Sequence, residues 1–130
     1  MIEKWKAVWR DAIAPQLSTA GLRALREALL TDNLRLLQGS TTQPLPLTSF
    51  RDFEVEGACA IGYCGWIGDG LRLVSDVEEY FAKVCHETDV ALDEPAGCRW
   101  FLNWADQTPR DEMRRKLLSE VESVLAARQD

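Results

Sequence analysis

The clearest structural signal in the sequence is an amphipathic helix near its C-terminal end. Thr108 and Pro109 are typical of a helix start, because proline suits the first helical position, where the backbone N–H has no partner within the helix. Asp111 follows Thr108 at the spacing of an acidic capping partner. The spacing of the next apolar residues predicts a helix over residues 109–127. These residues recur at intervals of four, four and three: Met113, Leu117, Val121 and Val124.

Two more helices are predicted in the N-terminal third of the chain. Residues 3–14 carry apolar side chains at helical spacing, and Pro15 is expected to end this helix because it has no N–H to donate. Ser18 or Thr19 can cap a second helix, which is followed by a further turn over residues 34–37. The apolar stripe of the second helix consists of Leu22, Leu25 and Leu29.

The middle of the chain begins with a connector over residues 39–56. It contains Pro44 and Pro46, and alternating apolar residues predict a short strand in its second half. Residues 57–67 are apolar with small residues at every third or fourth position, which favours a buried central helix; a buried strand is the alternative. The glycines of this segment lack the lysine of a phosphate-binding loop, so we expect them to serve packing and turns.

Another helix is predicted after this segment. Ser75 and Glu78 have the spacing of a capping box, in which the hydroxyl and the carboxylate each pair with a backbone N–H. The helix would span residues 76–87, and residues 88–97 would form a polar loop. Residues 98–104 are a dense apolar run, which is compatible with a strand or with one helical turn.

These elements predict a mostly α fold, a compact bundle of about five helices. An α-dominant α+β fold with one short two-stranded element is the alternative. The largest apolar residues of the predicted elements should form most of the core. They are Trp5, Trp9, Leu22, Leu25, Ile61, Trp66, Tyr80, Phe81, Val84, Trp100, Leu117 and Val121.

Chain length and the distribution of apolar residues set the expected context. With 130 residues, the chain suits one domain over residues 1–130. No segment has the roughly 20 apolar residues of a membrane span, and residues 1–10 lack the apolar core of a signal peptide. We therefore expect a cytoplasmic protein without a membrane partner, whose four cysteines are reduced thiols.

Charge is unevenly distributed along the chain. The net charge is −6, but residues 52–94 contain eleven acidic and two basic residues, a local net charge of −9. Direct binding of nucleic acid is not expected, because phosphate contacts need clustered lysine and arginine. A basic protein partner fits the acidic segment better, although the same charges would also suit a solvated surface. The candidate partner-binding residues are Glu54, Glu56, Asp69, Asp76, Glu78, Glu79, Asp93 and Glu94.

The cysteines and the single histidine are the candidate metal ligands, namely Cys59, Cys64, Cys85, His86 and Cys98. Structural zinc sites usually bring pairs of ligands two residues apart, so that one turn of backbone holds the ion. Here Cys59 and Cys64 are five positions apart, and the adjacent Cys85 and His86 would diverge on a helix. Cys85 also falls on the apolar face of its predicted helix. We therefore expect no metal and no cofactor.

A cysteine nucleophile is the other chemical possibility. Cys59 lies near a predicted helix start, where the helix dipole would lower a thiol pKa. His86 is the only imidazole available as a base, and Asp106 is one of the residues that could orient it. The surrounding acidic residues would oppose formation of a thiolate. Cys59, His86 and Asp106 are therefore minor catalytic candidates.

Basic residues gather on the C-terminal helix. They are interleaved with acidic residues, which is typical of a solvated helix face rather than of a nucleic-acid or membrane surface. We expect them to cover the outer side of the helix or to pair with the acidic segment, within one chain or between two. The residues are Arg110, Arg114, Arg115 and Lys116.

The segment Cys59-Ala60-Ile61-Gly62 resembles the Cys-x-x-Gly helix of small uncharacterised proteins from phages and bacteria. In those proteins it follows an aromatic connector, here Phe50 to Phe53, and precedes a capped C-terminal helix, here from Thr108. Their usual glycine-threonine lead-in is replaced here by Glu56-Gly57-Ala58. The resemblance implies a small helical fold and a phage or mobile-element origin. It implies no activity.

Three functional classes follow from these observations. The favoured class is a non-enzymatic regulatory protein that binds a basic protein, such as a phage-encoded inhibitor whose carboxylates take the place of nucleic-acid phosphates on a host protein. The second is a small thiol- or zinc-dependent enzyme centred on Cys59 and His86. The third is a structural homo-oligomer, such as a homodimer, in which the acidic segment meets the basic C-terminal helix of a neighbouring copy.

Overall fold

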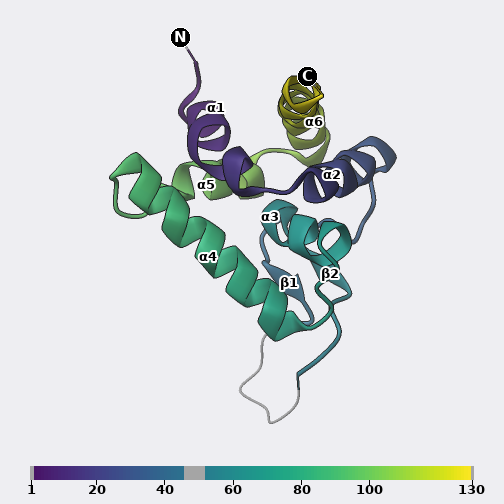
Figure 1. The fold of residues 1–130 in the computed structure, drawn as a ribbon. Helices are drawn as coiled ribbons and strands as arrows, with labels where there is room; N and C mark the ends of the chain where they lie inside the picture. The colour runs from purple at the N-terminus through teal and green to yellow at the C-terminus, as the bar shows by residue number, and fades with distance from the viewer. Residues whose placement is uncertain (1, 46–51, 130) are drawn as a thin grey trace.

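The computed structural model describes residues 2–45 and 52–129. In these ranges the chain forms six α-helices and one antiparallel sheet of two short strands, which confirms a mostly α fold with a two-stranded element. Figure 1 shows the long helix α4 (Val74–Leu92) along one side of the molecule, with its first turns near the strands and its last turns leading toward α5 (Arg99–Gln107). Within the described residues, no helix combines the length and hydropathy needed to cross a bilayer.

The N-terminal helix changes its winding before it ends. α1 (Lys4–Val8) continues into a π-helical turn, η1 (Trp9–Ile13), and then into a 3-10 turn, η2 (Ala14–Gln16). Pro15 cannot donate a hydrogen bond to the carbonyl four residues earlier, so regular α-helical winding cannot pass through it. The predicted helix is confirmed, although its winding continues through Pro15 as a 3-10 turn that ends at Gln16. Its buried residues include Trp5, Val8, Trp9 and Ile13.

Helix α2 (Thr19–Thr31) begins at the predicted cap. Ser18 Oγ accepts a hydrogen bond from the backbone N–H of Gly21 at 2.8 Å, which pairs one of the N–H groups that the first turn leaves free. The helix ends at Asp32, whose φ of 50° lies in the left-handed region that aspartate tolerates. This residue turns the chain out of the helix, so the predicted helical turn over residues 34–37 is wrong.

The two strands of the sheet lie before and after the predicted strand. β1 (Thr42–Gln43) pairs antiparallel with β2 (Gly57–Ala58), and Gln43 lies opposite Gly57. Part of the predicted strand, residues 46–51, lies outside the described residues. The connector therefore supplies one strand at its beginning, and the second strand comes from the segment that follows it.

Residues 57–67, predicted as one buried helix, divide between a strand and a helix. The first two residues form β2, and Cys59 then caps a helix that runs as α3 (Ala60–Tyr63) and a π-helical turn, η3 (Cys64–Gly68). The helix prediction is therefore confirmed from Ala60 onward, and the strand alternative applies to two residues only. Gly70, with a φ of 83°, forms the turn that follows.

The glycines of this segment bring η3 close to its neighbours. A Cβ atom on Gly68 would lie 2.2 Å from the Cα of Gly21, so α2 and η3 meet backbone to backbone. A Cβ atom on Gly65 would lie 2.8 Å from the ring of Tyr80 on α4. The packing role predicted for these glycines is therefore confirmed.

Helix α4 is longer at both ends than predicted, and the capping box at its start is wrong. Ser75 Oγ donates its hydrogen bond to the Asp52 carboxylate, and Glu78 accepts one from Thr42 Oγ1 at 2.6 Å. Both side chains therefore join the first turns of α4 to the preceding segments instead of pairing with the backbone of the helix. Because α4 runs to Leu92, the predicted polar loop over residues 88–97 is wrong in its first half.

The apolar run over residues 98–104 belongs to helix α5. A helix places every third or fourth residue on one side, so Phe101 is buried and Trp104 packs against the core. Trp100 lies on the other side with half of its surface exposed, and its prediction as a core residue is wrong. α6 (Arg110–Arg128) follows after a short turn.

The start of α6 lies one residue later than predicted. Pro109 is the capping residue and not the first helical residue, and no side-chain cap forms there. Asp111 is exposed and lies 3.5 Å from Arg114. The predicted capping pair of Thr108 and Asp111 is therefore wrong, although the helix itself is confirmed.

Aromatic rings from the first and fifth helices form the centre of the core. Trp5 stacks on Trp104 with ring centroids 3.5 Å apart, and Trp9 lies 5.4 Å from Phe101. Of the other predicted core residues, three are partly buried against the core: Trp66, Tyr80 and Phe81. Six more are fully buried: Leu22, Leu25, Ile61, Val84, Leu117 and Val121.

Candidate functional site

Some of the acidic side chains predicted to bind a partner make contacts within the chain. Glu54 pairs with Arg72 at 2.5 Å. Glu94 accepts hydrogen bonds from Trp100 Nε1 at 2.9 Å and from the Lys4 ammonium group at 3.4 Å. The Trp100 hydrogen bond, and after it the Lys4 contact, hold the pKa of Glu94 below its usual range. These carboxylates are partly neutralised or held in place, so they are less available to a partner.

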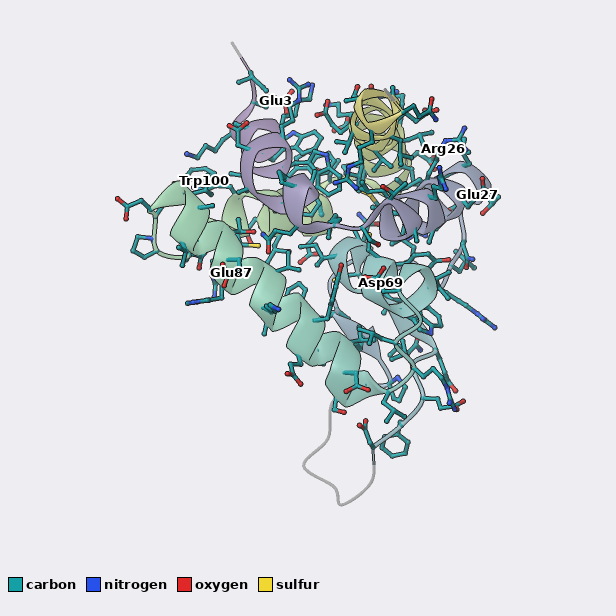
Figure 2. All side chains as sticks on the ribbon, in the orientation of Figure 1. Glu3, Arg26, Glu27, Asp69, Glu87 and Trp100 are labelled. Atoms are coloured by element: carbon teal, nitrogen blue, oxygen red, sulfur yellow. The ribbon has the colours of Figure 1, made fainter. Side chains whose placement is uncertain are left out.

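Two more candidates hold neighbouring segments together. Asp69, which follows η3, accepts a hydrogen bond from Ser18 Oγ at the start of α2. Glu78 accepts the bond from Thr42 described above, and Thr42 is itself buried. Figure 2 shows Asp69 where η3 ends, beside the ribbon of α2. Both carboxylates therefore have structural roles whether or not a partner binds.

The remaining acidic candidates are exposed. Within the described residues, the side chains of Glu56, Asp76, Glu79 and Asp93 form no hydrogen bond or ion pair. Glu87, which was not among the predicted binding residues, is also exposed, and its side chain forms no hydrogen bond or ion pair with the described residues. Figure 2 shows Glu87 on α4. Of all the acidic residues in the segment, those on α4 are the best placed to act together.

Asp76, Glu79 and Glu87 share one face of α4. At about 100° per residue, these three positions fall within roughly 80° of one another around the helix, and they span about 16 Å along its axis. Lys83 lies in the same sector and is the one basic residue among them. We call these three carboxylates the acidic face of α4. All three positions lie within the helix predicted over residues 76–87, so the sequence alone could have indicated this face.

Two arginines of the predicted basic cluster point inward instead of covering the outer side of α6. Arg110 Nε lies 2.7 Å from Asp32 Oδ1, and the same guanidinium group donates to the backbone carbonyl of Leu36 at 2.9 Å. Arg114 donates to the carbonyl of Leu29 at 3.0 Å. The last carbonyls of a helix lack partners and attract cations, so Arg114 stabilises the end of α2, while Arg110 holds the capping residue Asp32 and the segment that follows it. The prediction that they lie on a solvated face is wrong.

A pocket of about 410 Å³ brings together two of the three catalytic candidates. Cys59 and Asp106 both line it, together with Glu78 and the apolar side chains of Phe81 and Leu102. Residues 39–41 at the beginning of the connector also line it. His86, the third candidate, is exposed and does not line this pocket.

The environment of the Cys59 thiol opposes ionisation. Burial, with a smaller contribution from the nearby charges of Asp106 and Glu78, raises the pKa of Cys59 to about 12. Hydrogen bonds from the backbone of the helix start, including Gly62 N–H at 3.4 Å, act in the opposite direction and are weaker. The helix start therefore lowers this pKa as predicted, but burial outweighs it, and the acidic neighbours oppose ionisation as expected.

We expect Cys59 to resist alkylation in the folded protein. At pH 8.5, a thiol with a pKa of about 12 carries on the order of a thousandfold less thiolate than an unperturbed cysteine. Its labelling by iodoacetamide should remain slow from pH 7 to 10 and become fast after unfolding in urea. Mass spectrometry of tryptic peptide 52–72 measures the extent of this labelling. A labelling midpoint near the ordinary thiol pKa would contradict the geometry of the pocket.

The candidate metal ligands do not converge. Within residues 2–45 and 52–129, the cysteine, histidine and acidic side chains form no group of three that could hold an ion. The Cys64 thiol donates to the Ala60 carbonyl inside its own helix. The four cysteines are free, but Cys85 and Cys98 lie next to each other with sulfur atoms 3.1 Å apart.

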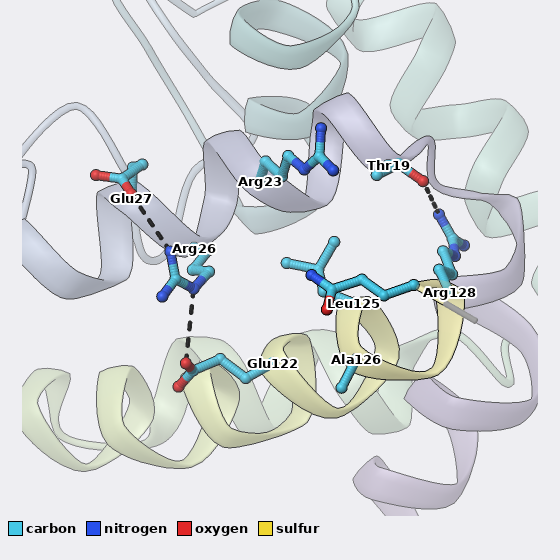
Figure 3. A pocket seen from close by; sticks show the side chains of 9 residues that line it. Thr19, Arg23, Arg26, Glu27, Glu122, Leu125, Ala126 and Arg128 are labelled. Carbon is cyan, nitrogen blue, oxygen red and sulfur yellow. Dashed lines mark hydrogen bonds and ion pairs between the residues drawn. The ribbon is translucent and has the colours of Figure 1, made fainter.

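A larger groove of about 530 Å³ lies between α2 and α6 (Figure 3). Arg23, Arg26 and Arg128 line it, which would suit an anionic ligand. However, Arg26 lies 3.5 Å from Glu27 and 3.6 Å from Glu122, and two acidic side chains in the lining leave little net positive charge. Arg128 also donates to the Thr19 hydroxyl at 3.3 Å. These contacts indicate a role in joining the two helices.

Comparison of the chain with protein-family models, curated proteins and solved structures finds no match. The resemblance to small phage and bacterial proteins with a Cys-x-x-Gly helix therefore stays a prediction. Function has to be inferred from the chemistry of the residues themselves.

Proposed function

We propose that this protein is a non-enzymatic binding protein, and that the acidic face of α4 contacts a basic surface of another protein. The observation that carries this proposal is the exposure of Asp76, Glu79 and Glu87 on one helix face, without a hydrogen bond or ion pair to any described residue. Unpaired carboxylates on one face produce a field that attracts a basic partner and orients it during the encounter.

The rigidity of α4 also supports this function. Val77 and Val84 are buried on an adjoining side of the helix, and Thr88 is fully buried near its C-terminal end. The carboxylates are therefore presented by a helix that is anchored to the core, so a partner need not order this element when it binds.

The contacts of the basic residues on α6 favour a different protein as the partner over a second copy of this chain. The homo-oligomer hypothesis needs the basic residues of α6 to reach the acidic segment of a neighbouring copy. Arg110 and Arg114 are already bonded to the end of α2, and Lys116 lies 3.5 Å from Glu112. Arg115 is then the one member of that cluster without such a contact among the described residues.

The chemistry of the acidic face of α4 indicates the class of partner. Carboxylates spaced along a rigid helix can occupy the positions of phosphates on a protein surface that binds nucleic acid. We therefore propose a nucleic-acid-handling protein as the partner, and inhibition by competition with nucleic acid as the mode of action. A phage origin belongs to this proposal and rests on the sequence resemblance; a cytoplasmic location also belongs to it and rests on the distribution of apolar residues along the chain.

The test compares two variants that have the same net charge. Glu79→Gln with Glu87→Gln neutralises the acidic face and leaves Asp76 to stabilise the first turn of α4. Asp11→Asn with Asp111→Asn removes two exposed carboxylates elsewhere. Partners captured from a cell extract by the wild-type protein are measured at low and high salt. We expect the first variant to lower the affinity on the order of tenfold at low salt and the control to leave it nearly unchanged.

Two further measurements in the same experiment test the proposal. Added duplex DNA should displace the captured partner, and raising the salt concentration should weaken capture because it screens the charges. Equal effects of both variants would show that only net charge matters. Capture that resists salt, DNA and the α4 variant would contradict the proposed interface.

A further inference from the structure

Two of the four cysteines form a pair that neither the proposed binding function nor the fold requires. Cys85 lies on α4 and Cys98 directly precedes α5, and the two sulfur atoms are 3.1 Å apart. The short turn after α4 returns the chain so that these residues meet. Asp89 Oδ1 accepts a hydrogen bond from the backbone N–H of Cys98 at 2.8 Å, which holds Cys98 in this position.

The two thiols differ in their tendency to ionise. The contact with the Cys85 sulfur stabilises the ionised form of Cys98 and lowers its pKa, although burial opposes this shift. The same interaction with Cys98, together with burial, raises the pKa of Cys85. Cys98 is therefore the more readily ionised thiol of the pair, which suits nucleophilic attack by its sulfur and closure by the Cys85 sulfur.

We propose that Cys85 and Cys98 are a redox site, at which hydrogen peroxide converts two adjacent thiols into a disulfide that joins α4 to the start of α5. This inference is independent of the partner-binding proposal. It rests on the approach of the two sulfur atoms, on the turn that fixes it, and on the differing environments of the other two thiols.

The reaction has two steps. The Cys98 thiolate attacks one oxygen of hydrogen peroxide; the O–O bond breaks, the departing hydroxide takes a proton and leaves as water, and Cys98 becomes a sulfenic acid. The Cys85 sulfur, having lost its proton, then attacks the Cys98 sulfur; the S–O bond breaks, and the hydroxyl group leaves as a second water with that proton. In total, two thiols lose two electrons and two protons, and one peroxide is reduced to two waters.

The geometry suits this closure and the size of the oxidant. The sulfur atoms at 3.1 Å need to approach by only about 1 Å to reach the disulfide bond length. Cys85 is partly exposed, but Cys98 has only 3% of its surface exposed, so a small peroxide should reach it more readily than a bulky disulfide such as oxidised glutathione. Cys59 and Cys64 have raised pKa values because of burial, so both should react more slowly.

Peptide mass spectrometry tests the site directly, because trypsin cleaves after Lys83 and Arg99 and leaves both cysteines in peptide 84–99. The full-length protein is treated with hydrogen peroxide, unfolded, alkylated and digested. Peptide 84–99 should lose the mass of two hydrogen atoms and carry no alkyl group. Peptide 52–72, which contains Cys59 and Cys64, should carry two alkyl groups. Dithiothreitol should restore both alkylation sites in peptide 84–99.

Two variants separate the pair from general oxidation. In Cys85→Ser, Cys98 should stop at the sulfenic acid, which a dimedone probe detects; in Cys59→Ala, the disulfide should form as in the wild type. The oxidised wild type should unfold at a Tm roughly 5–10 °C higher than the reduced protein, because the closed loop restricts the unfolded chain. Full alkylation of peptide 84–99 after peroxide treatment, or preferential oxidation of peptide 52–72, would overturn the proposal without affecting the partner-binding one.

Discussion

Replacing Phe101 by alanine should lower the free energy of unfolding by about 3–5 kcal/mol, as is typical for removal of a large aromatic side chain from a core. Phe101 has 1% of its surface exposed, and its ring lies 5.4 Å from that of Trp9 and 6.4 Å from that of Trp5. The substitution leaves a cavity where three helical segments meet. Because a domain of this size has a total stability of about 5–15 kcal/mol, urea denaturation followed by tryptophan fluorescence should show a much lower midpoint.

The neighbouring residue provides the matched control. Trp100 is larger than Phe101, but half of its surface is exposed. Its contacts are a cation–π interaction with Lys4 at 5.6 Å and a hydrogen bond to Glu94. Trp100→Ala should therefore cost about 1 kcal/mol or less. If Trp100→Ala proved as destabilising as Phe101→Ala, the orientation of α5 described above would be wrong.

Replacing Gly68 by alanine should destabilise the fold by about 3 kcal/mol or more, near the upper end of the cost of overpacking. Helix propensity alone predicts the opposite sign, because alanine is better than glycine within a helix by about 1 kcal/mol. The steric effect should prevail, since the added Cβ atom would lie 2.2 Å from the Cα and 2.6 Å from the backbone nitrogen of Gly21. Backbone atoms cannot rotate away, so α2 and η3 would have to separate.

Substitutions of two other glycines test this reasoning, with the free energy of unfolding measured by thermal and urea denaturation. Gly65→Ala should cost less than Gly68→Ala, because its Cβ atom meets the Tyr80 ring, which can shift. Gly70→Asn should cost under about 1 kcal/mol, since no atom lies within 4 Å of an added Cβ there and asparagine tolerates the positive φ. A Gly68→Ala protein as stable as the wild type would exclude the close contact between α2 and η3.

Local patterns in the sequence were sufficient for most of the helices. The α2 stripe, the Ser18 cap, the effect of Pro15 and the long C-terminal helix all depend on residues within a few positions of one another. Helix boundaries and side-chain pairing were predicted less well. Ser75 and Glu78 had the spacing of a capping box, yet both bond to earlier parts of the chain, because partners brought close by folding replaced the local ones.

The candidate site was predictable only in part. The acidic segment is a property of composition, so it could be read from the sequence, but four of its eight candidate carboxylates have internal partners. Glu87 lies within the helix predicted over residues 76–87, so helical spacing from Asp76 and Glu79 could have placed it on the same charged face. The adjacent thiols of Cys85 and Cys98 were overlooked because the turn between α4 and α5 brings them together.

The sequence by itself determined that this chain is mostly helical, where its principal helices lie, and that its middle segment is acidic, because periodicity, capping residues and charge are local properties. Tertiary structure decided which side of each helix is buried, as with Trp100 and Phe101, and which charges remain free. Arg110 and Arg114 illustrate the reason: their partners at the end of α2 lie more than 70 residues earlier in the chain. Contacts of that kind depend on how the helices pack, which no short-range pattern encodes.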